Sequence, residues 1–319
     1  MLGRIMMVGI LCLLFIVSLF IGVSHVSLTS LFSDANALTV FLDSRIPRTL
    51  AVILTGMSVA NAGLIMQILM RNRFVDPSMT GTTESAALGL LLVTIFIPSA
   101  SLGIKMLVAA IVAIIGLSGF MMIVRRLPPT ALLLIPLTGI LYGGVISAIS
   151  LFIAYETDML QSMVAWIIGD FSSVLTGRYE LLWGTGILCV VSFFYSNQFT
   201  IAGLGKEMSL NLGLNHQQIT RMGLVIVALI SAIVVVTVGG IPFIGLVVPN
   251  IVSRLMGDNV KETLPWIMLS GAVLVLFCDI LSRVINYPYE IPVGTIIGIL
   301  GTIVFLYLLY GRAPRYAKK

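Results

Sequence analysis

The stretch GGIPFIGLVVPNIVSR occupies residues 239–254 and decides how the chain folds. It is strongly apolar, yet Gly239, Gly240 and Pro242 stand together at its start, and such residues interrupt a helix. Irregular backbone inside a membrane has to face protein or a cavity, because lipid cannot satisfy its polar groups. We therefore expect a short helix over about 243–256 that begins at a break and packs inside a bundle.

The rest of the chain has the composition of a membrane protein. Of its 319 residues, 59% are hydrophobic and 10% are charged, whereas a soluble domain carries roughly 25% charged residues. Apolar runs near the ~20 residues that cross a bilayer recur throughout, which predicts helices and not a barrel of short alternating strands. The first run, 5–23, lacks a small-x-small cleavage site after it, so we interpret it as a retained span.

Reading the apolar runs against their polar and Pro/Gly breaks predicts an all-α membrane protein with ten segments. The third and eighth are short for a full crossing. The segments are 5–23, 50–70, 84–98, 104–124, 131–154, 181–196, 222–239, 243–256, 265–285 and 293–310.

The distribution of positive residues predicts the orientation. With the amino terminus inside, 13 of the 18 Lys and Arg residues fall on the cytoplasmic side, as cytoplasmic loops require. Both termini are then cytoplasmic, and the net charge of +5 gives no reason to expect nucleic acid as a partner. The polar connections are short, so we expect residues 1–319 to form one transmembrane domain, with any energy-converting domain on another chain.

Motifs for chemistry are missing. The string closest to a phosphate-binding loop, GLGKE at 203–207, lacks the spacing and the Ser or Thr that hold a nucleotide and magnesium. His25 and His216 are far apart, and the three cysteines lie in apolar stretches without CxxC spacing, so neither a metal site nor a disulfide is expected. We predict no catalytic residue and no metal ligand.

Several short motifs are informative in combination. They are RIPR at 45–48, RNRFVDP at 71–77, the opening stretch at 239–254, CDILSR at 278–283 and EIPVG at 290–294. A short amphipathic segment also precedes the seventh span, over about 206–221. From its residues alone, this segment fits equally well on a membrane surface or in a groove of a soluble partner.

In this order, the motifs closely resemble the permease family of binding-protein-dependent importers for iron-siderophores, haem and vitamin B12. The resemblance covers nearly the whole chain, although Asn250 and Arg73 replace a usual histidine and a usual proline. It implies a ten-helix subunit in the bacterial inner (cytoplasmic) membrane that pairs with an identical or related permease. It also implies two cytoplasmic ATPase subunits, which use ATP and magnesium, and a soluble or lipid-anchored binding protein. No cofactor is expected on this chain itself.

The resemblance assigns roles to individual residues. Arg45, Arg48 and Arg283 match positions that face the binding protein. From the residues alone, an alternative stays open: the first two mark a membrane boundary, and Arg283 pairs with Asp279 one helical turn away. A cytoplasmic gate is implied at Asn72, Phe74, Pro129 and Thr130.

The same resemblance places a segment that couples to the ATPase at about 199–221, which favours partner binding over the membrane surface. Its contact residues are Met208, Leu210, Leu212, Gly213, Leu214 and Arg221.

The substrate prediction rests on the branch of the family. RNRFVDP at 71–77 and TTES at 82–85 resemble permeases for catechol-type siderophores, so ferric siderophore is the expected cargo, with haem or vitamin B12 as the alternative. A different class, an ion-coupled secondary transporter, would use buried carboxylates such as Glu84 or Asp279, but no relay spacing accompanies them. Whether the permease pair is a homodimer or a heterodimer stays open.

Overall fold

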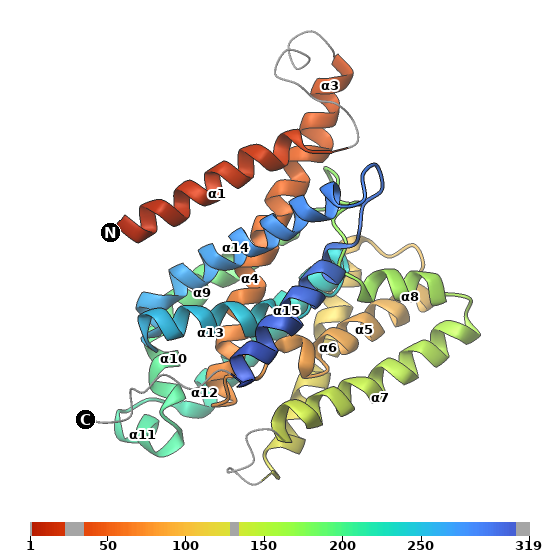
Figure 1. The fold of residues 1–319 in the computed structure, drawn as a ribbon. Coiled ribbons are helices and arrows are strands. Elements are labelled where there is room, and N and C mark those ends of the chain that lie inside the picture. The colour runs from red at the N-terminus through yellow and green to blue at the C-terminus, as the bar shows by residue number, and fades with distance from the viewer. Residues whose placement is uncertain (1, 23–34, 128–133, 311–319) are drawn as a thin grey trace.

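The structure, a computed structural model, describes residues 2–22, 35–127 and 134–310. These residues form helices joined by short turns, without a strand (Figure 1). In chain order the elements are α1 (Leu2–Phe20), α3 (Ala35–Val40), η1 (Phe41–Arg45), α4 (Ile46–Leu69), η2 (Pro77–Met79), α5 (Thr82–Phe96), α6 (Leu102–Val124), α7 (Leu134–Glu156), α8 (Leu160–Ile167), α9 (Leu182–Phe194), α10 (Ser196–Gly203), α11 (Lys206–Asn211), α12 (His216–Val238), α13 (Ile244–Met256), α14 (Val260–Val284) and α15 (Val293–Tyr310).

The expected all-α membrane bundle is confirmed, and each of the ten expected segments coincides with a helix. Within the described residues, five helices are long and apolar enough to span a membrane, and α9 with α10 adds a sixth span bent by 64°. The four remaining segments correspond to the shorter apolar helices Ile5–Phe20, Thr82–Phe96, Ile244–Met256 and Val293–Leu308. The two segments expected to be short are α5, with 15 residues, and α13, with 13.

Helix starts differ from the expected edges where a helix extends beyond its apolar part. We expected spans from 222 and 265, but α12 begins at His216 and α14 at Val260. Asn215 accepts a hydrogen bond from the Gln218 amide, and Asn259 accepts one from the Lys261 amide. These asparagines are N-caps, which satisfy free amides of the first turn. Hydropathy marks the part in the membrane, whereas the cap marks where the helix begins.

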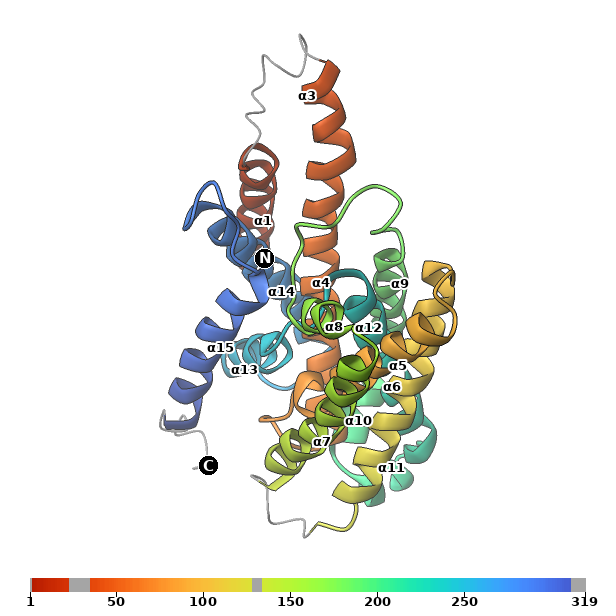
Figure 2. The same cartoon turned by 90° about the vertical axis from the view of Figure 1, so that its right-hand side faces the viewer.

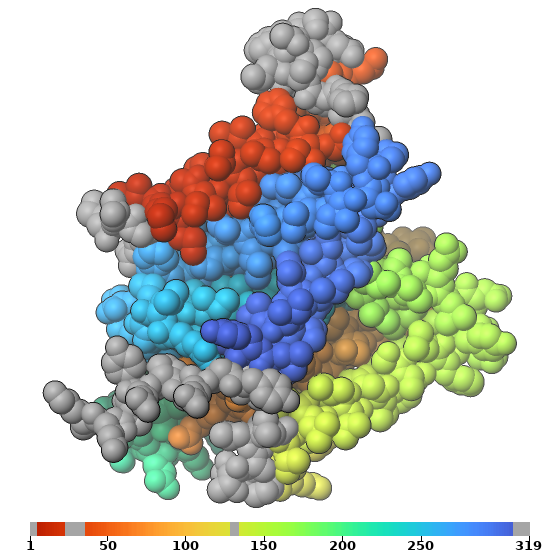
Figure 3. Space-filling view, in the orientation of Figure 1, coloured from red at the N-terminus to blue at the C-terminus, as the bar shows by residue number. Residues whose placement is uncertain are grey.

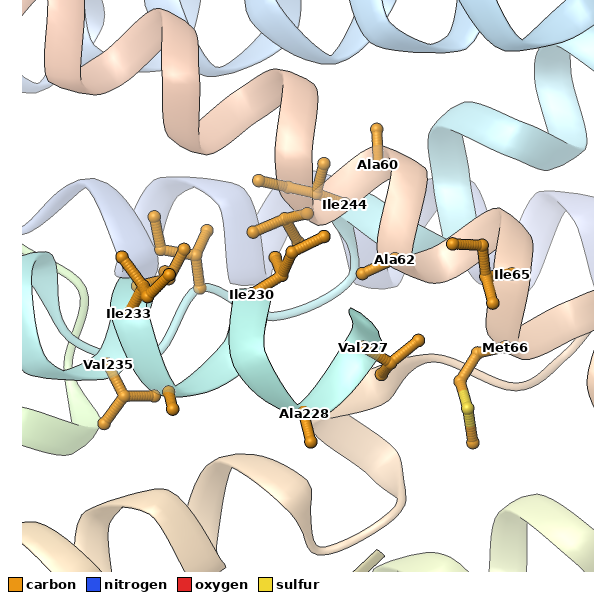
Figure 4. Close-up of a cluster of buried hydrophobic side chains, with 14 of the residues drawn as sticks. Ala60, Ala62, Ile65, Met66, Val227, Ala228, Ile230, Ile233, Val235 and Ile244 are labelled. Carbon is orange, nitrogen blue, oxygen red and sulfur yellow. The ribbon is translucent and has the colours of Figure 1, made fainter. Parts of the chain in front are cut away.

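Helix α4 runs through the centre of the bundle, in contact with α9, α12, α13 and α14 (Figure 2). Figure 4 shows the apolar core where α4, α12 and the start of α13 meet. Small residues bring these helices close together, as expected for membrane bundles. A Cβ added to Gly63 of α4 would lie 2.1 Å from the Cα of Gly245 in α13, so the two backbones are in direct contact.

The break before α13 is as expected, with its irregular backbone facing protein. Gly239 and Phe243 have positive φ angles of 85° and 66°. The Gly240 amide donates to the Trp166 carbonyl, and the Asp170 amide donates to the Val238 carbonyl. The end of α8 and the segment after it therefore satisfy polar groups of the broken backbone. On the surface, α1 lies over α14 (Figure 3). Helices α7 and α15 carry large exposed apolar side chains.

Candidate functional site

A buried cluster of charges joins α4 and α14 at the end of the bundle that carries RIPR. Arg48 donates from Nε and Nη2 to one oxygen of Asp279, at 3.1 and 2.9 Å, and from Nη1 to Glu290 at 2.7 Å. Arg283 donates to the second oxygen of Asp279. Asp279 is fully buried, and Arg48 and Arg283 are 7% and 3% exposed. One carboxylate thus holds two guanidinium groups in a site closed to solvent.

The same cluster secures the end of α1. Arg283 Nη1 donates to the carbonyls of Ser18 and Ile21, both at 2.9 Å, and Nη2 donates to the Ser18 hydroxyl. Arg45 also donates to the Ile21 carbonyl. The last carbonyls of a helix lack internal partners, and cations stabilise that end of the helix. The arginines therefore anchor α1 to α4 and α14.

The three residues predicted to dock the binding protein thus lie together, but inside the chain. The pairing of Arg283 with Asp279, which the sequence left open as an alternative, is present. Docking by these arginines stays a prediction, since no partner chain tests it. Sequence reasoning did not assign Glu290 to the cluster, although its motif was recognised. Its side chain is 24% exposed, so it is the acidic member of the cluster closest to solvent.

The gate turn, residues 70–76 after α4, holds Asn72 and Phe74 in a fixed conformation. Asn72 is buried, its amide donates to the Gln67 carbonyl at 3.0 Å, and its side-chain oxygen accepts from the Phe74 amide at 2.9 Å. The Phe74 ring meets Phe305 of α15 edge to face, with centroids 6.2 Å apart. Pro129 and Thr130 lie outside the described residues, so the gate itself stays a prediction.

The gate turn ends at Asp76, which is buried beside the start of α13. Burial raises the pKa of the Asp76 carboxyl to about 6, although hydrogen bonds from the Ser78 amide and hydroxyl act in the opposite direction. Desolvation disfavours the charged form of a carboxyl, whereas hydrogen bonds to the carboxylate favour it. Asp76 is therefore a proton-binding group at the junction of the gate turn and α13.

Two residues that sequence reasoning gave no role connect this turn to α13. Gln67 donates from Nε2 to the Gly245 carbonyl at 3.0 Å, and Asn250 donates from Nδ2 to the Arg73 carbonyl at 2.7 Å. Asn250 had stood out only as a departure from the family pattern, and Gln67 lies within the apolar segment 50–70. Neither signal identifies a partner 177 or 178 positions away in sequence.

The predicted coupling segment, at about 199–221, covers the end of α10, all of α11 and the first turns of α12. A turn at Gly213, with φ 75°, separates the two helices. Met208, Leu210 and Leu212 are each more than half exposed, Leu214 is half-buried and Arg221 is exposed. A hollow of about 410 Å³, lined by Leu210, Gly213 and Leu214 among others, lies between α11 and α12. The segment thus offers exposed apolar side chains, as a helix that enters a partner's groove does, but coupling stays a prediction.

The structure also shows how the segment touches the gate turn. Gly205, which directly precedes α11, has a φ of 104°, and the Arg71 guanidinium lies against it. A Cβ built at Gly205 would lie 3.0 Å from Arg71 Nη1. Among the described residues, no three His, Cys, Asp or Glu side chains are grouped as ligands of a metal ion would be. The sites assembled by the described residues are ion pairs and helix contacts.

An all-helical bundle with this set of apolar spans and a broken inner helix is a multi-pass membrane protein. Residues 10–311 match the model of the FecCD transport family, so the chain belongs to that family. The resemblance seen in the motifs is thereby confirmed, as is the class of a transport subunit and not an enzyme.

Individual relatives agree with this assignment, and a solved structure shares the fold. The chain is 45% identical to the petrobactin import system permease protein YclN of Bacillus subtilis, over 95% of this chain and 96% of that protein. It is 38% identical to the ferric-anguibactin transport system permease protein FatD of Vibrio anguillarum, over 92% and 94%. An inward-facing metal-chelate type ABC transporter has the same fold, with a TM-score of 0.78 and 24% identity over 96% of this chain and 97% of that one.

Proposed function

We propose that this chain is a permease subunit of an ATP-binding-cassette importer that carries a ferric siderophore of catechol type into the cytoplasm. The observation that carries the proposal is the 45% identity, over nearly the full length of both chains, to a permease named for petrobactin. The relative named for ferric-anguibactin supports the same class of cargo. A haem or vitamin B12 importer is the second candidate, because the family resemblance includes both.

The partners follow from the same proposal. A second permease, identical or related, would complete the pathway, and a binding protein would deliver the siderophore from outside. Two cytoplasmic ATPase subunits would supply ATP and magnesium chemistry, with no cofactor on this chain. We place the chain in the bacterial inner membrane with both termini in the cytoplasm, because 13 of its 18 Lys and Arg residues then lie inside.

In this mechanism the chain's own residues transmit motion and bind no substrate covalently. The exposed side chains of Met208, Leu210 and Leu212 would sit in the groove of an ATPase. Closure of the ATPases would move α11, and the contact between Gly205 and Arg71 would pass that motion to the gate turn. At the opposite end, the charge cluster holds α1, α4 and α14 in register, which would give the binding protein a rigid surface.

ATP-dependent uptake of radiolabelled ferric catechol siderophore tests the proposal. Proteoliposomes would contain this chain together with a second permease and an ATPase, and the loaded binding protein would be added on the outside. We expect uptake that needs every component and that persists when ion gradients are collapsed. Uptake of haem or cobalamin in place of siderophore would change the substrate, whereas uptake without any ATPase would refute the importer.

A further inference from the structure

Helix α13 contains Pro249 in its interior. Proline has no backbone N–H, so the carbonyl four residues earlier loses its helical donor. That carbonyl belongs to Gly245, which is buried beside α4. A buried carbonyl without a donor is costly, so another group has to take the place of the missing amide.

The side chain of Gln67 takes that place. It extends from the last turn of α4, is 8% exposed, and donates from Nε2 to the Gly245 carbonyl at 3.0 Å. The approach requires that Gly63 and Gly245 both lack a side chain, because a Cβ on either would lie under 3 Å from the backbone of the other. The proline in one helix and the amide in its neighbour therefore form a matched pair.

A second hydrogen bond is donated by α13 to the gate turn, from Asn250, the residue after Pro249. Asn250 is 7% exposed and donates from Nδ2 to the Arg73 carbonyl and to the Leu246 carbonyl, both at 2.7 Å. Arg73 lies in the gate turn between Asn72 and Phe74. Gln67 thus binds α13 from the helix that leads into the turn, and Asn250 binds the turn from α13.

We propose that Gln67 and Asn250 are positioning residues that lock the gate turn onto α13, and that Pro249 serves to leave the Gly245 carbonyl open to Gln67. The inference rests on the proposed function, in which this turn belongs to the gate. Because both bonds are buried, the turn and α13 move as one body, and the gate opens only when α13 moves. Loss of either bond frees the turn from α13 and uncouples ATP hydrolysis from transport.

The experiment compares Gln67→Leu in two backgrounds in the assembled transporter. With Pro249 present, we expect the siderophore transported per ATP hydrolysed to fall about tenfold. In a Pro249→Ala background, the regained N–H of residue 249 takes the Gly245 carbonyl from Gln67, so the ratio should already be low and Gln67→Leu should lower it further by less than about twofold. A general loss of packing at position 67 would give the same loss in both backgrounds.

A matched pair of variants tests the second bond. Asn250→Leu removes the donor and should lower the ratio about tenfold, whereas Asn250→His keeps an N–H donor and should retain it within about twofold. Histidine is also the residue usual at this position in the family pattern. Equal damage by both variants would overturn the role of Asn250.

Hydrogen exchange of the purified chain gives a readout that does not depend on transport. Amides of the gate turn should exchange about tenfold faster in Gln67→Leu and Asn250→Leu, while those in the centres of α6 and α12 stay unchanged. Faster exchange throughout the bundle, or none in the turn, would refute the lock. If the wild-type assembly fails to transport, the proposed function falls, and the exchange result still decides whether the lock exists.

Discussion

Asp279→Asn is expected to be among the most damaging single changes in the chain. The fully buried carboxylate accepts from Arg48 and Arg283, and its loss leaves two buried guanidiniums with Glu290 as the remaining carboxylate of the cluster. Breaking a buried ion pair by removing one partner costs about 3–5 kcal/mol. We expect that loss in the free energy of unfolding, measured in mixed detergent with increasing dodecyl sulfate.

The double variant Asp279→Asn with Arg283→Met separates charge imbalance from lost packing. It removes one charge of each sign, so it should be more stable than the sum of the two single variants predicts, by at least about 2 kcal/mol. Arg178→Met is the matched control, because Arg178 is an exposed arginine, and it should change stability by less than about 0.5 kcal/mol. Additive single effects, or an equal loss in the control, would refute the buried cluster.

Three further predictions concern α13, the gate turn and the coupling segment. Gly63→Ala should abolish the yield of folded protein in size-exclusion chromatography, because its Cβ would overlap Gly245, whereas Gly103→Ala, with no atom within 4 Å, should be tolerated. Burial raises the pKa of Asp76 from 3.8 to about 6, so the native state binds this proton more tightly than the unfolded chain does. Its contribution to stability should therefore fall by about 3 kcal/mol as pH rises from about 4 to 6, and Asp76→Asn should remove that slope from a plot of Tm against pH. Leu210→Glu should leave Tm within about 2 °C of the wild-type value, because the Leu210 side chain is 56% exposed. The same variant should abolish co-purification with the ATPase, and retained binding would contradict the coupling role.

The sequence predicted the helices well because hydropathy and turn residues are local signals. The short α13 followed from the two glycines and the proline at 239–242, and the ten apolar segments each became a helix. The starts of α12 and α14 were predicted less accurately, since their N-caps, Asn215 and Asn259, lie outside the apolar runs. The short helix α8 was not expected as a separate element, because a run of 8 residues gives too little periodicity to detect.

The roles of the site residues were harder to predict, because each role depends on contacts with residues that are distant in sequence. The RIPR motif identified Arg48, but its burial depends on Asp279 and Glu290, which lie 231 and 242 positions away. An arginine next to a predicted membrane boundary reads equally well as a docking residue or as half of a buried pair. Only the packing of α4 against α14 distinguishes the two, and no single-sequence pattern encodes that packing.

The structure links the two ends of the chain's mechanism through one helix. Arg48 near the start of α4 belongs to the charge cluster that holds α1 and α14, and Gln67 in the last turn of α4 binds α13 beside the gate turn. Between them, Gly56 and Gly63 place α4 in backbone contact with α14 and α13. A close-packed helix of this kind transmits displacement along its length, because a change at one contact cannot be absorbed by loose side chains. If the proposed importer function holds, docking outside and gating inside are therefore coupled through α4, and substitutions along it should alter both together.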